Sequence, residues 1–516
     1  MGCWQRGLSR GNNDLAFGSY FRDDATIALS PTVINLLQNR KVLVIVFALA
    51  LFTMSARNVA DPDVWWHLRT GQLILQNHSF FHTDPYSFTR FGQPWINHEW
   101  FSEVLLFSLY RFARFGGLIV VFGTVITTTF LLVFKRCPGC PYIAALITLW
   151  GAAASVPSWG IRPQMFSLLL ASGFLILLEA SNRRPALLWW TPPLMLLWVN
   201  LHGGYPIGLA FLLLFLTGEI LEAAIHTGQW TLSAPRIRTL ALVFAICLAL
   251  VSLNPNGLRI YSYPFETLSA RAMQRFIQEW SSPDFHDPSY APFLLMLLAL
   301  VAGLALSRRR RRIRDIVLLL ATIPAALYSV RHIPIAVLVL TPALAGLAEA
   351  RLSGRGHVRS FQKGQIEVTT RTALLNALVL VTSLSFTVAW VRHIARQQGQ
   401  IEAEKFPFAA SAFLNRERPQ GPILNHYNWG GYFIWKLYPQ YRVFVDGRAD
   451  VYGDQFIDAF AASYYLTGNW KQPIEQWGIQ TIILPPDAPL VTALRSGPGW
   501  QMIYADSQAV ILSHRH

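Results

Sequence analysis

The stretch that decides the interpretation of this chain runs from Asn58 to Trp100, NVADPDVWWHLRTGQLILQNHSFFHTDPYSFTRFGQPWINHEW. It gathers acids, histidines and aromatic residues in a chain that is otherwise dominated by apolar runs. It follows directly after the first apolar run, residues 42–57. Ionisable groups next to a bilayer are costly to place there, and they usually have a function. We therefore interpret residues 58–100 as a catalytic loop and the rest of the chain as its scaffold.

The composition around this loop is that of a polytopic α-helical membrane protein. Of the 516 residues, 53% are hydrophobic and only 14% are charged, and the mean hydropathy is +0.34. A transmembrane helix needs about 20 predominantly apolar residues. Runs that reach or approach this length recur at 42–57, 116–134, 141–157, 164–180, 187–200, 206–225, 239–253, 291–306, 315–330, 333–348 and 373–391. We expect about 11 to 12 transmembrane helices.

The net charge of +15 does not indicate a nucleic-acid partner, because the basic residues lie in short gaps between apolar runs. Cytoplasmic loops of membrane proteins are enriched in Lys and Arg in this way. The basic gaps are Lys135-Arg136, Arg183-Arg184, Arg236 to Arg238, Arg308 to Arg314 and Arg351 to Arg371. The remaining loops, including residues 58–100, are then extracytoplasmic. These features predict a protein of the cell (inner) membrane whose main partner is the lipid bilayer.

Three regions follow from this pattern. Residues 1–40 form a polar cytoplasmic tail, residues 41–391 a transmembrane domain, and residues 392–516 a small extracytoplasmic α/β domain. In the last region we expect strands at 443–445, 481–484 and 509–512 and a helix at 409–416. Two further segments are expected to be helices that do not cross: Glu99 to Phe115 as an interfacial or partly inserted helix, and Phe265 to Trp280 along the membrane surface.

The acids at the start of the loop are its first candidate catalytic groups. Asp61 and Asp63 flank Pro62, which restricts the backbone. Paired carboxylates near a low-dielectric boundary suit one of them to general-base work, or both to binding a divalent metal such as Mg or Mn. The alternative is that Asp63 only caps the helix expected from Val64 to Gln76.

Histidines and a further acid follow on both sides of the loop. His67 and Arg69 come one turn after the acids, and His98 and Glu99 close the loop between Trp95 and Trp100. We expect His67 and Glu99 to take part in catalysis and Arg69 and His98 to bind substrate. Tryptophan is common at membrane interfaces for physical reasons, so interfacial anchoring is the alternative for this segment.

Four basic residues lie at the extracytoplasmic ends of different expected helices: Arg162, His202, Arg331 and His332. Arginine offers paired donors to a phosphate, so these residues indicate an anionic ligand. Snorkelling of a basic side chain explains a single arginine at a helix end, and it is the alternative here.

The C-terminal region carries two stretches that suit a sugar, Asn425 to Tyr432 and Val445 to Gly453. Aromatic rings stack on sugars, and Asn, Asp and Arg side chains form hydrogen bonds with them. Trp429 and Arg448 are the candidate substrate-binding residues in these stretches. Asp446-Gly447 can equally be an ordinary turn after a strand.

An acid-bearing first loop directly after the first transmembrane helix, Asp61-Pro-Asp-Val-Trp-Trp-His-Leu-Arg69, resembles the corresponding loop of the GT-C integral membrane glycosyltransferases. That group includes protein O-mannosyltransferases, the lipid A aminoarabinose transferase and the catalytic subunit of oligosaccharyltransferase. The many-helix body and the C-terminal domain are similar to that architecture. The resemblance implies that Asp61 or Asp63 is the catalytic or metal-binding acid, and that Arg331 binds the phosphate of a lipid-linked donor.

Two departures from the family narrow the range of acceptor molecules to be expected. The chain has no W-W-D-Y-G-like stretch and no adjacent Asp-Glu pair in the first loop. We therefore expect an inverting transferase that moves a sugar from a polyprenyl-phosphate donor to a glycan or lipid acceptor. The alternatives are a transporter or flippase of a lipid-linked glycan and a non-catalytic protein of envelope assembly.

Overall fold

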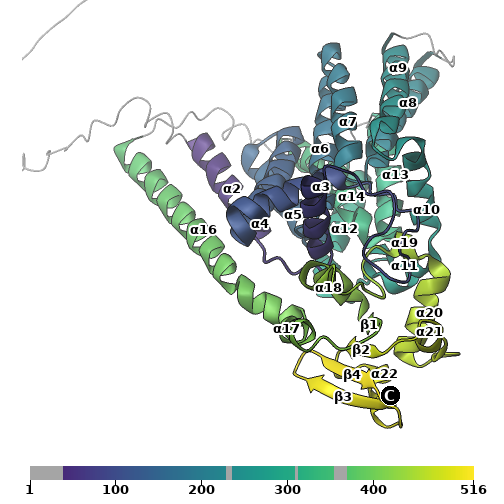
Figure 1. The fold of residues 1–516 in the computed structure, drawn as a ribbon. Helices are drawn as coiled ribbons and strands as arrows, with labels where there is room; N and C mark the ends of the chain where they lie inside the picture. The colour runs from purple at the N-terminus through teal and green to yellow at the C-terminus, as the bar shows by residue number, and fades with distance from the viewer. Residues whose placement is uncertain (1–38, 228–234, 308–311, 354–368, 516) are drawn as a thin grey trace, which may run out of the picture.

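The computed structural model describes residues 39–227, 235–307, 312–353 and 369–515, so nearly all of the expected tail 1–40 lies outside the described residues. The chain forms a bundle of apolar helices with a small mixed domain at one end (Figure 1). The main helices of the bundle are α2 (Asn39–Ser55), α3 (Val64–Asn77), α4 (Trp100–Arg136), α5 (Pro141–Ser155), α6 (Gln164–Ala180), α7 (Thr191–Leu201), α8 (Pro206–Thr227), α9 (Pro235–Leu250), α12 (Ala291–Ala305), α13 (Ile313–Tyr328), α14 (Ile333–Ser353) and α16 (Thr370–Lys405).

Seven described helical segments are long and apolar enough to cross a membrane. They are Trp100–Arg136, Pro141–Ser158, Pro206–Ile225, Pro235–Leu253, Pro288–Ala305, Val330–Leu352 and Thr370–Lys405. Shorter helices such as α2 and α6, each of 17 residues, pack among them. The chain is an integral membrane protein, and the total of 11 to 12 crossings stays a prediction.

Helix α4 consists of two helical parts separated by a kink. The backbone of Arg114 leaves helical geometry (φ 51°, ψ −153°), which separates the part that begins at Trp100 from the part that ends at Arg136. The first part packs closely on α3, because a side chain at Gly71 would overlap the carbonyl of Glu103. The part of α4 before Arg114, which covers most of the expected segment Glu99 to Phe115, is thus distinct from the part that follows it, and it packs against α3.

Helix α16 connects the bundle to the C-terminal domain and runs beside α2 (Figure 1). Asn58 donates a hydrogen bond to the carbonyl of Ile394 (2.9 Å), and the backbone N–H of Val59 donates to Gln398 (2.8 Å). The domain boundary expected at residue 392 therefore falls inside one continuous helix. Through these hydrogen bonds, the same helix fixes the start of the first loop against the end of the membrane domain.

The C-terminal domain is built on a four-stranded sheet in the order β1-β2-β4-β3. Strand β1 (Ile423–Asn425) runs parallel to β2 (Thr481–Leu484), whereas β4 (Val510–His514) is antiparallel to both β2 and β3 (Trp500–Ala505). Around the sheet lie α17 (Phe408–Glu417), α18 (Gly430–Leu437), α19 (Ala449–Tyr452), α20 (Asp454–Tyr465), α21 (Gln472–Gln476) and α22 (Pro489–Arg495). The polytopic helical fold class with a small C-terminal α/β domain is confirmed.

Two local expectations were wrong. Residues 443–445 do not form a strand of the sheet, because Val443 pairs with the first loop instead, in a single bridge to Ser87. The expected surface helix from Phe265 to Trp280 is broken into α10 (Tyr263–Ser269), α11 (Arg271–Phe276) and the 3-10 turn η5 (Gln278–Trp280). The carboxylate of Asp454 accepts hydrogen bonds from the N–H groups of the first two residues of α11, at 3.0 and 2.9 Å, and so starts a new helix there.

Candidate active site

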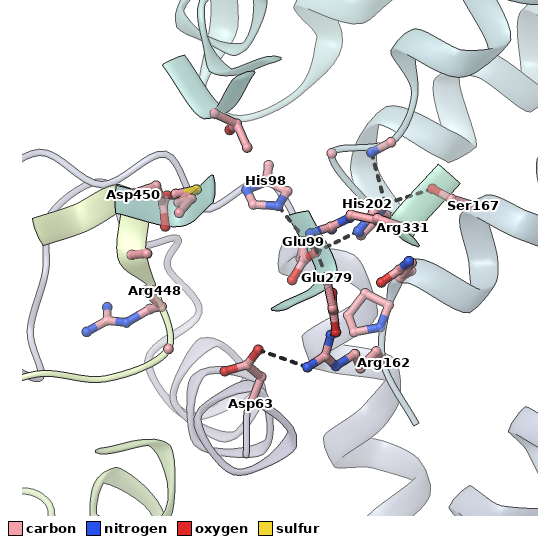
Figure 2. A pocket seen from close by; sticks show the side chains of 18 of the residues that line it. Asp63, His98, Glu99, Arg162, Ser167, His202, Glu279, Arg331, Arg448 and Asp450 are labelled. Atoms are coloured by element: carbon pink, nitrogen blue, oxygen red, sulfur yellow. Dashed lines mark hydrogen bonds and ion pairs between the residues drawn. The ribbon is translucent and has the colours of Figure 1, made fainter. Parts of the chain in front are cut away.

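A cavity of about 330 Å³ lies where the first loop, the bundle and the C-terminal domain meet. Its lining comes from both ends of the first loop, the start of α6, the turn before α8, the segment from Tyr263 to Trp280, Arg331 and His332, and two stretches of the C-terminal domain. Figure 2 shows charged side chains from these distant segments facing one another. The cavity is therefore a product of the tertiary fold.

The acids of the first loop form a tight turn held by Arg162. One oxygen of Asp61 accepts the backbone N–H of Asp63 (2.9 Å), and the other is paired with the guanidinium of Arg162. The second carboxylate, Asp63, lies 3.8 Å from Arg162 and accepts a hydrogen bond from the indole N–H of Trp66 (3.2 Å). Asp63 stands at the start of α3 but makes no side-chain capping hydrogen bond. Capping therefore does not explain this acid.

Asp63 is a carboxylate of this turn whose pKa is shifted upward. Burial raises the pKa of Asp63 to about 6, although the neighbouring His67 acts to lower it. The C-terminal domain contributes to this burial, because a side chain at Gly447 would overlap the carboxylate of Asp63. A carboxylate with a pKa near 6 is mostly ionised at neutral pH and is still basic enough to accept a proton.

A second acid, Glu279, joins Arg162 to Arg331. Its carboxylate is paired with Arg162 and lies 4.0 Å from Arg331. Burial opposes ionisation, but the two arginines outweigh it and hold the pKa of Glu279 below its usual range. The guanidinium of Arg331 also lies over the ring of Trp280, 5.1 Å from its centroid. Arg162 is thus shared among three carboxylates, whereas Arg331 has, among the residues that the structure describes, a single and longer ion pair.

Glu99 is surrounded by three imidazole rings. One carboxylate oxygen lies 3.2 Å from Nε2 of both His98 and His202, and the other lies 3.4 Å from Nε2 of His67. Burial alone would raise the pKa of Glu99, but His98 and His67 hold it well below its usual range. Glu99 is therefore a fixed negative charge in the wall of the cavity.

The hydrogen bonds assign different protonation states to two of these histidines. Nδ1 of His202 accepts the backbone N–H of Gly204 (2.9 Å), so its proton is on Nε2, which faces Glu99. Burial lowers the pKa of His202 to about 3, in agreement with a neutral ring. Both nitrogens of His98 face acceptors, the carbonyl of Ile96 (3.2 Å) and Glu99. Burial acts against charge there, but Glu99 outweighs it and raises the pKa of His98.

Arg448 belongs to a separate, closed cluster. It is paired with Asp446 (2.7 Å) and Asp84 (2.8 Å), and all three side chains are buried. The guanidinium also lies over the rings of Trp95 and Tyr86. Figure 2 shows it pointing away from Arg162, Glu279 and Arg331. Arg448 reaches the edge of the cavity, but its charge serves to attach the C-terminal domain to the first loop.

Two expected substrate-binding residues lie elsewhere. Arg69 donates hydrogen bonds to Gln72 (2.9 Å) and to the carbonyl of Tyr438, and it does not line the cavity. Trp429 is buried next to the rings of His426 and Phe433. Both residues contribute to packing within or against the C-terminal domain. The remaining expected residues that line the cavity are Asp63, His67, His98, Glu99, Arg162, His202, Arg331 and His332.

Sequence reasoning missed several residues of the cavity. Glu279 and Trp280 lay in the segment interpreted as a surface helix, and Tyr263, which stacks on His98 with ring centroids 4.0 Å apart, lay in the same loop. Asp450 lines the cavity and is exposed, although it comes from the same D-G-R-A-D stretch as buried Asp446. The one sequence feature that could have indicated Glu279 and Asp450 as cavity residues was their position in loops rich in aromatic residues.

The geometry does not fit a divalent metal at Asp61 and Asp63. The guanidinium of Arg162 occupies the position between the two carboxylates, and the remaining oxygens accept N–H groups. In the described residues, no group of three or more His, Cys, Asp or Glu side chains is arranged to hold a metal ion. A cation there would have to displace Arg162.

The comparison with solved structures concerns the fold as a whole. The apo oligosaccharyltransferase of Archaeoglobus fulgidus is similar with a TM-score of 0.52 at 11% identity, over 93% of this chain and 75% of that chain. ArnT from Cupriavidus metallidurans bound to undecaprenyl phosphate matches with a TM-score of 0.46 at 12% identity, over 92% of this chain and 97% of that chain. No protein-family model and no curated protein matches the sequence. This chain is an integral membrane protein with a GT-C-like fold.

Proposed function

We propose that the protein is a membrane glycosyltransferase of the inverting type, which moves a sugar from a polyprenyl-phosphate donor to a hydroxyl group of a glycan or lipid acceptor. One observation carries this proposal. One cavity at the end of the bundle combines Asp63, a carboxylate whose pKa is raised to about 6, with Arg331, which has one long ion pair in the described part of the chain. The first group suits proton removal and the second suits a phosphate.

The reaction follows from these two groups. The acceptor hydroxyl gives its proton to Asp63, and its oxygen forms a bond with the anomeric carbon of the donor sugar. The bond from that carbon to the phosphate oxygen breaks, and the lipid phosphate leaves with one more negative charge. Arg331 and Arg162 stabilise this charge, because cations fixed before the reaction need no reorganisation when it develops. Direct displacement inverts the anomeric centre.

The sugar would lie between the catalytic turn and the C-terminal domain. Asp450 and Tyr427 line the cavity from that domain, and His98 lines it from the end of the first loop. A carboxylate accepts hydrogen bonds from sugar hydroxyls, and an aromatic ring stacks on the apolar face of a sugar. Asp450 and Tyr427 thus supply complementary contacts for a polyhydroxylated ring.

The proposed orientation places the cavity on the extracytoplasmic side. Glu99 precedes α4 at the cavity, whereas Lys135 and Arg136 end the same helix at its far end. Arg183 and Arg184 likewise follow α6, whose first residues line the cavity. Positive charge is concentrated on the cytoplasmic side of membrane proteins. This distribution supports a cell-membrane enzyme that works outside the cytoplasm.

The metal expected from the paired acids is replaced in this proposal by arginine. Arg162 and Arg331 provide the cationic charge that Mg or Mn would supply. The test is turnover after exhaustive treatment with EDTA. We expect no change beyond twofold, and a loss restored by added Mg or Mn would contradict the assignment.

The function itself is tested by incubating purified protein with a panel of polyprenyl-phosphate sugars and following the release of polyprenyl phosphate. We expect release with at least one donor and its loss in Asp63→Asn. If wild-type protein releases nothing from any donor but moves the lipid across vesicle membranes, the flippase alternative replaces the transferase.

A further inference from the structure

A second hollow, of about 810 Å³, lies beside the active-site cavity between α2, the loop before α6 and α16. We call it the α16 groove. Its lining residues are Thr53, Met54, Ala56, Arg57, Asn58, Ala60, Asp61, Pro62, Trp159, Gly160, Ile161, Phe386, Trp390, Ile394, Ile401 and Lys405. None of the charged groups that line the active-site cavity belongs to this list.

The groove meets the active site at the turn of the two acids. Asp61 lines the groove and not the cavity, Asp63 lines the cavity and not the groove, and Pro62 between them lines both. The pair of Asp61 and Arg162 therefore forms part of the wall between the two spaces. A molecule bound in the groove would reach the turn of Asp61 and Asp63 from the groove and not from the cavity, where the proposed donor binds.

The groove carries positive charge that is not neutralised. Neither Arg57 nor Lys405 lies within ion-pair distance of a carboxylate in the described ranges of the chain. The guanidinium of Arg57 is half-buried and lies over the ring of Trp159, 5.6 Å from its centroid. A snorkelling arginine would extend into water, whereas this one is held inside the groove. The single acid of the lining, Asp61, is already paired with Arg162.

The other wall of the groove is apolar and faces outward. Phe386 is 61% exposed and Trp390 is 37% exposed on the same helix, α16. The apolar part of this helix is almost entirely uncovered by the rest of the chain, as expected for a helix in contact with lipid. The groove thus combines an open apolar side with two cations, Arg57 and Lys405, that have no carboxylate partner in the described ranges.

We propose that the α16 groove binds an anionic lipid, with the lipid phosphate held by Arg57 and Lys405 and one chain lying along Phe386 and Trp390. Two cations fit a phosphate, and an apolar helix face fits its chain. The second part of the proposal rests on the proposed function: a hydroxyl on the headgroup of this lipid, placed at the turn of Asp61 and Asp63, is the acceptor of the sugar.

The test uses the full-length protein in nanodiscs that contain a photoreactive phosphatidylglycerol, whose headgroup combines a phosphate with free hydroxyls. After irradiation, labelled peptides are mapped. We expect labelling of residues 53–62 and of the C-terminal half of α16. The double variant Arg57→Gln/Lys405→Gln should reduce this labelling about tenfold, because two charge-assisted contacts are lost. Ile401→Trp, which fills the groove without removing a charge, should reduce it as well.

Arg392→Gln is the matched control. Arg392 is an exposed arginine on the same helix that does not line the groove. The Arg392→Gln variant should be labelled in the groove to the same extent as the wild-type protein. Labelling that is equal in the double variant and in wild type, or that maps outside the groove, would overturn the lipid site. Labelling of the groove without transfer of radioactive sugar to the bound lipid, while another acceptor is glycosylated, would overturn only the acceptor role.

Failure of the proposed function gives a different result. In that case no donor releases polyprenyl phosphate, yet the groove is still labelled in a charge-dependent way. If release of polyprenyl phosphate is observed and the groove is not labelled, the transferase proposal is supported and the groove proposal is contradicted.

Discussion

Two clusters of acids and arginines lie a short distance apart in this protein, and they differ in how completely their charges are satisfied. In the cluster of Arg448 with Asp84 and Asp446, all three side chains are at most 1% exposed, and Tyr452 donates a further hydrogen bond to Asp446 (2.7 Å). In the cluster of Asp63, Arg162, Glu279 and Arg331, the side chains are 22% to 34% exposed.

This difference separates a structural role from a chemical one. A buried ion pair that is closed to solvent is not accessible to a ligand, and removing one partner is costly. The partly open cluster has a carboxylate with a raised pKa and an arginine with one distant partner, so it can still bind a charged group. The same residue types thus attach one domain and line the candidate active site beside it.

The largest effect on the open cluster is expected from Asp63→Asn. Loss of a general base reduces turnover by roughly 10²- to 10⁴-fold. Release of polyprenyl phosphate should fall by this factor, whereas the thermal midpoint and the binding of the donor lipid should stay near wild type. A variant with full activity would remove Asp63 from the mechanism.

The largest effect on the closed cluster is expected from Arg448→Gln. Two buried carboxylates then lose their cation, and the free energy of unfolding should fall by about 3–5 kcal/mol. Thermal unfolding and size-exclusion profiles of the purified protein measure this loss. A variant that is as stable as wild type but binds donor poorly would place Arg448 in the open cluster instead.

Activity should depend on pH through Asp63. Its pKa is raised to about 6, and the base must be ionised to accept a proton. Turnover should therefore reach a plateau above pH 7 and fall about tenfold for each pH unit below 6. The profile is measured as kcat at saturating donor. A flat profile between pH 5 and 7 would show that another group removes the proton.

A smaller effect is expected from Arg331→Gln. Hydrogen bonds to charged groups contribute about 1.5–3 kcal/mol, so donor affinity should weaken by at least about tenfold. Arg331→Lys should restore part of it, because a point charge remains without the paired donors. Binding of a polyprenyl-phosphate sugar to each variant gives the comparison. Equal affinities in all three proteins would remove Arg331 from the phosphate site.

The smallest effect is expected from Trp429→Phe. Trp429 is buried next to His426 and outside the cavity lining. Turnover and donor binding should change less than twofold, with at most a modest loss of thermal stability. A strong loss of donor binding at unchanged stability would show that Trp429 contacts the sugar directly.

Much of the architecture could be predicted because it depends on local patterns. Apolar runs predict membrane helices, and the runs at 164–180 and 141–157 correspond closely to α6 and α5. The helix expected at 409–416 corresponds to α17, and two of the three expected strands correspond to β2 and β4. The first loop was identified because acids and imidazoles are concentrated there against an apolar background.

Other features depend on contacts that local patterns do not encode. The strand expected at 443–445 pairs with the first loop, and Asp454 interrupts the helix expected from Phe265. Glu279 gave no sequence signal of its own, because its role comes from two arginines that lie far away in the chain.

The amino-acid pattern alone determined the class of protein, the position of the loop that lines the cavity and the presence of a mixed C-terminal domain, because hydrophobicity and residue type report these directly. Only the tertiary structure decided which charges remain available. Asp61 meets Arg162 across 101 residues, while Asp446 and Asp450, four residues apart, lie respectively in a closed ion-pair cluster and in the cavity wall. Burial and partner number set the chemistry of an ionisable group, and both are properties of the folded chain.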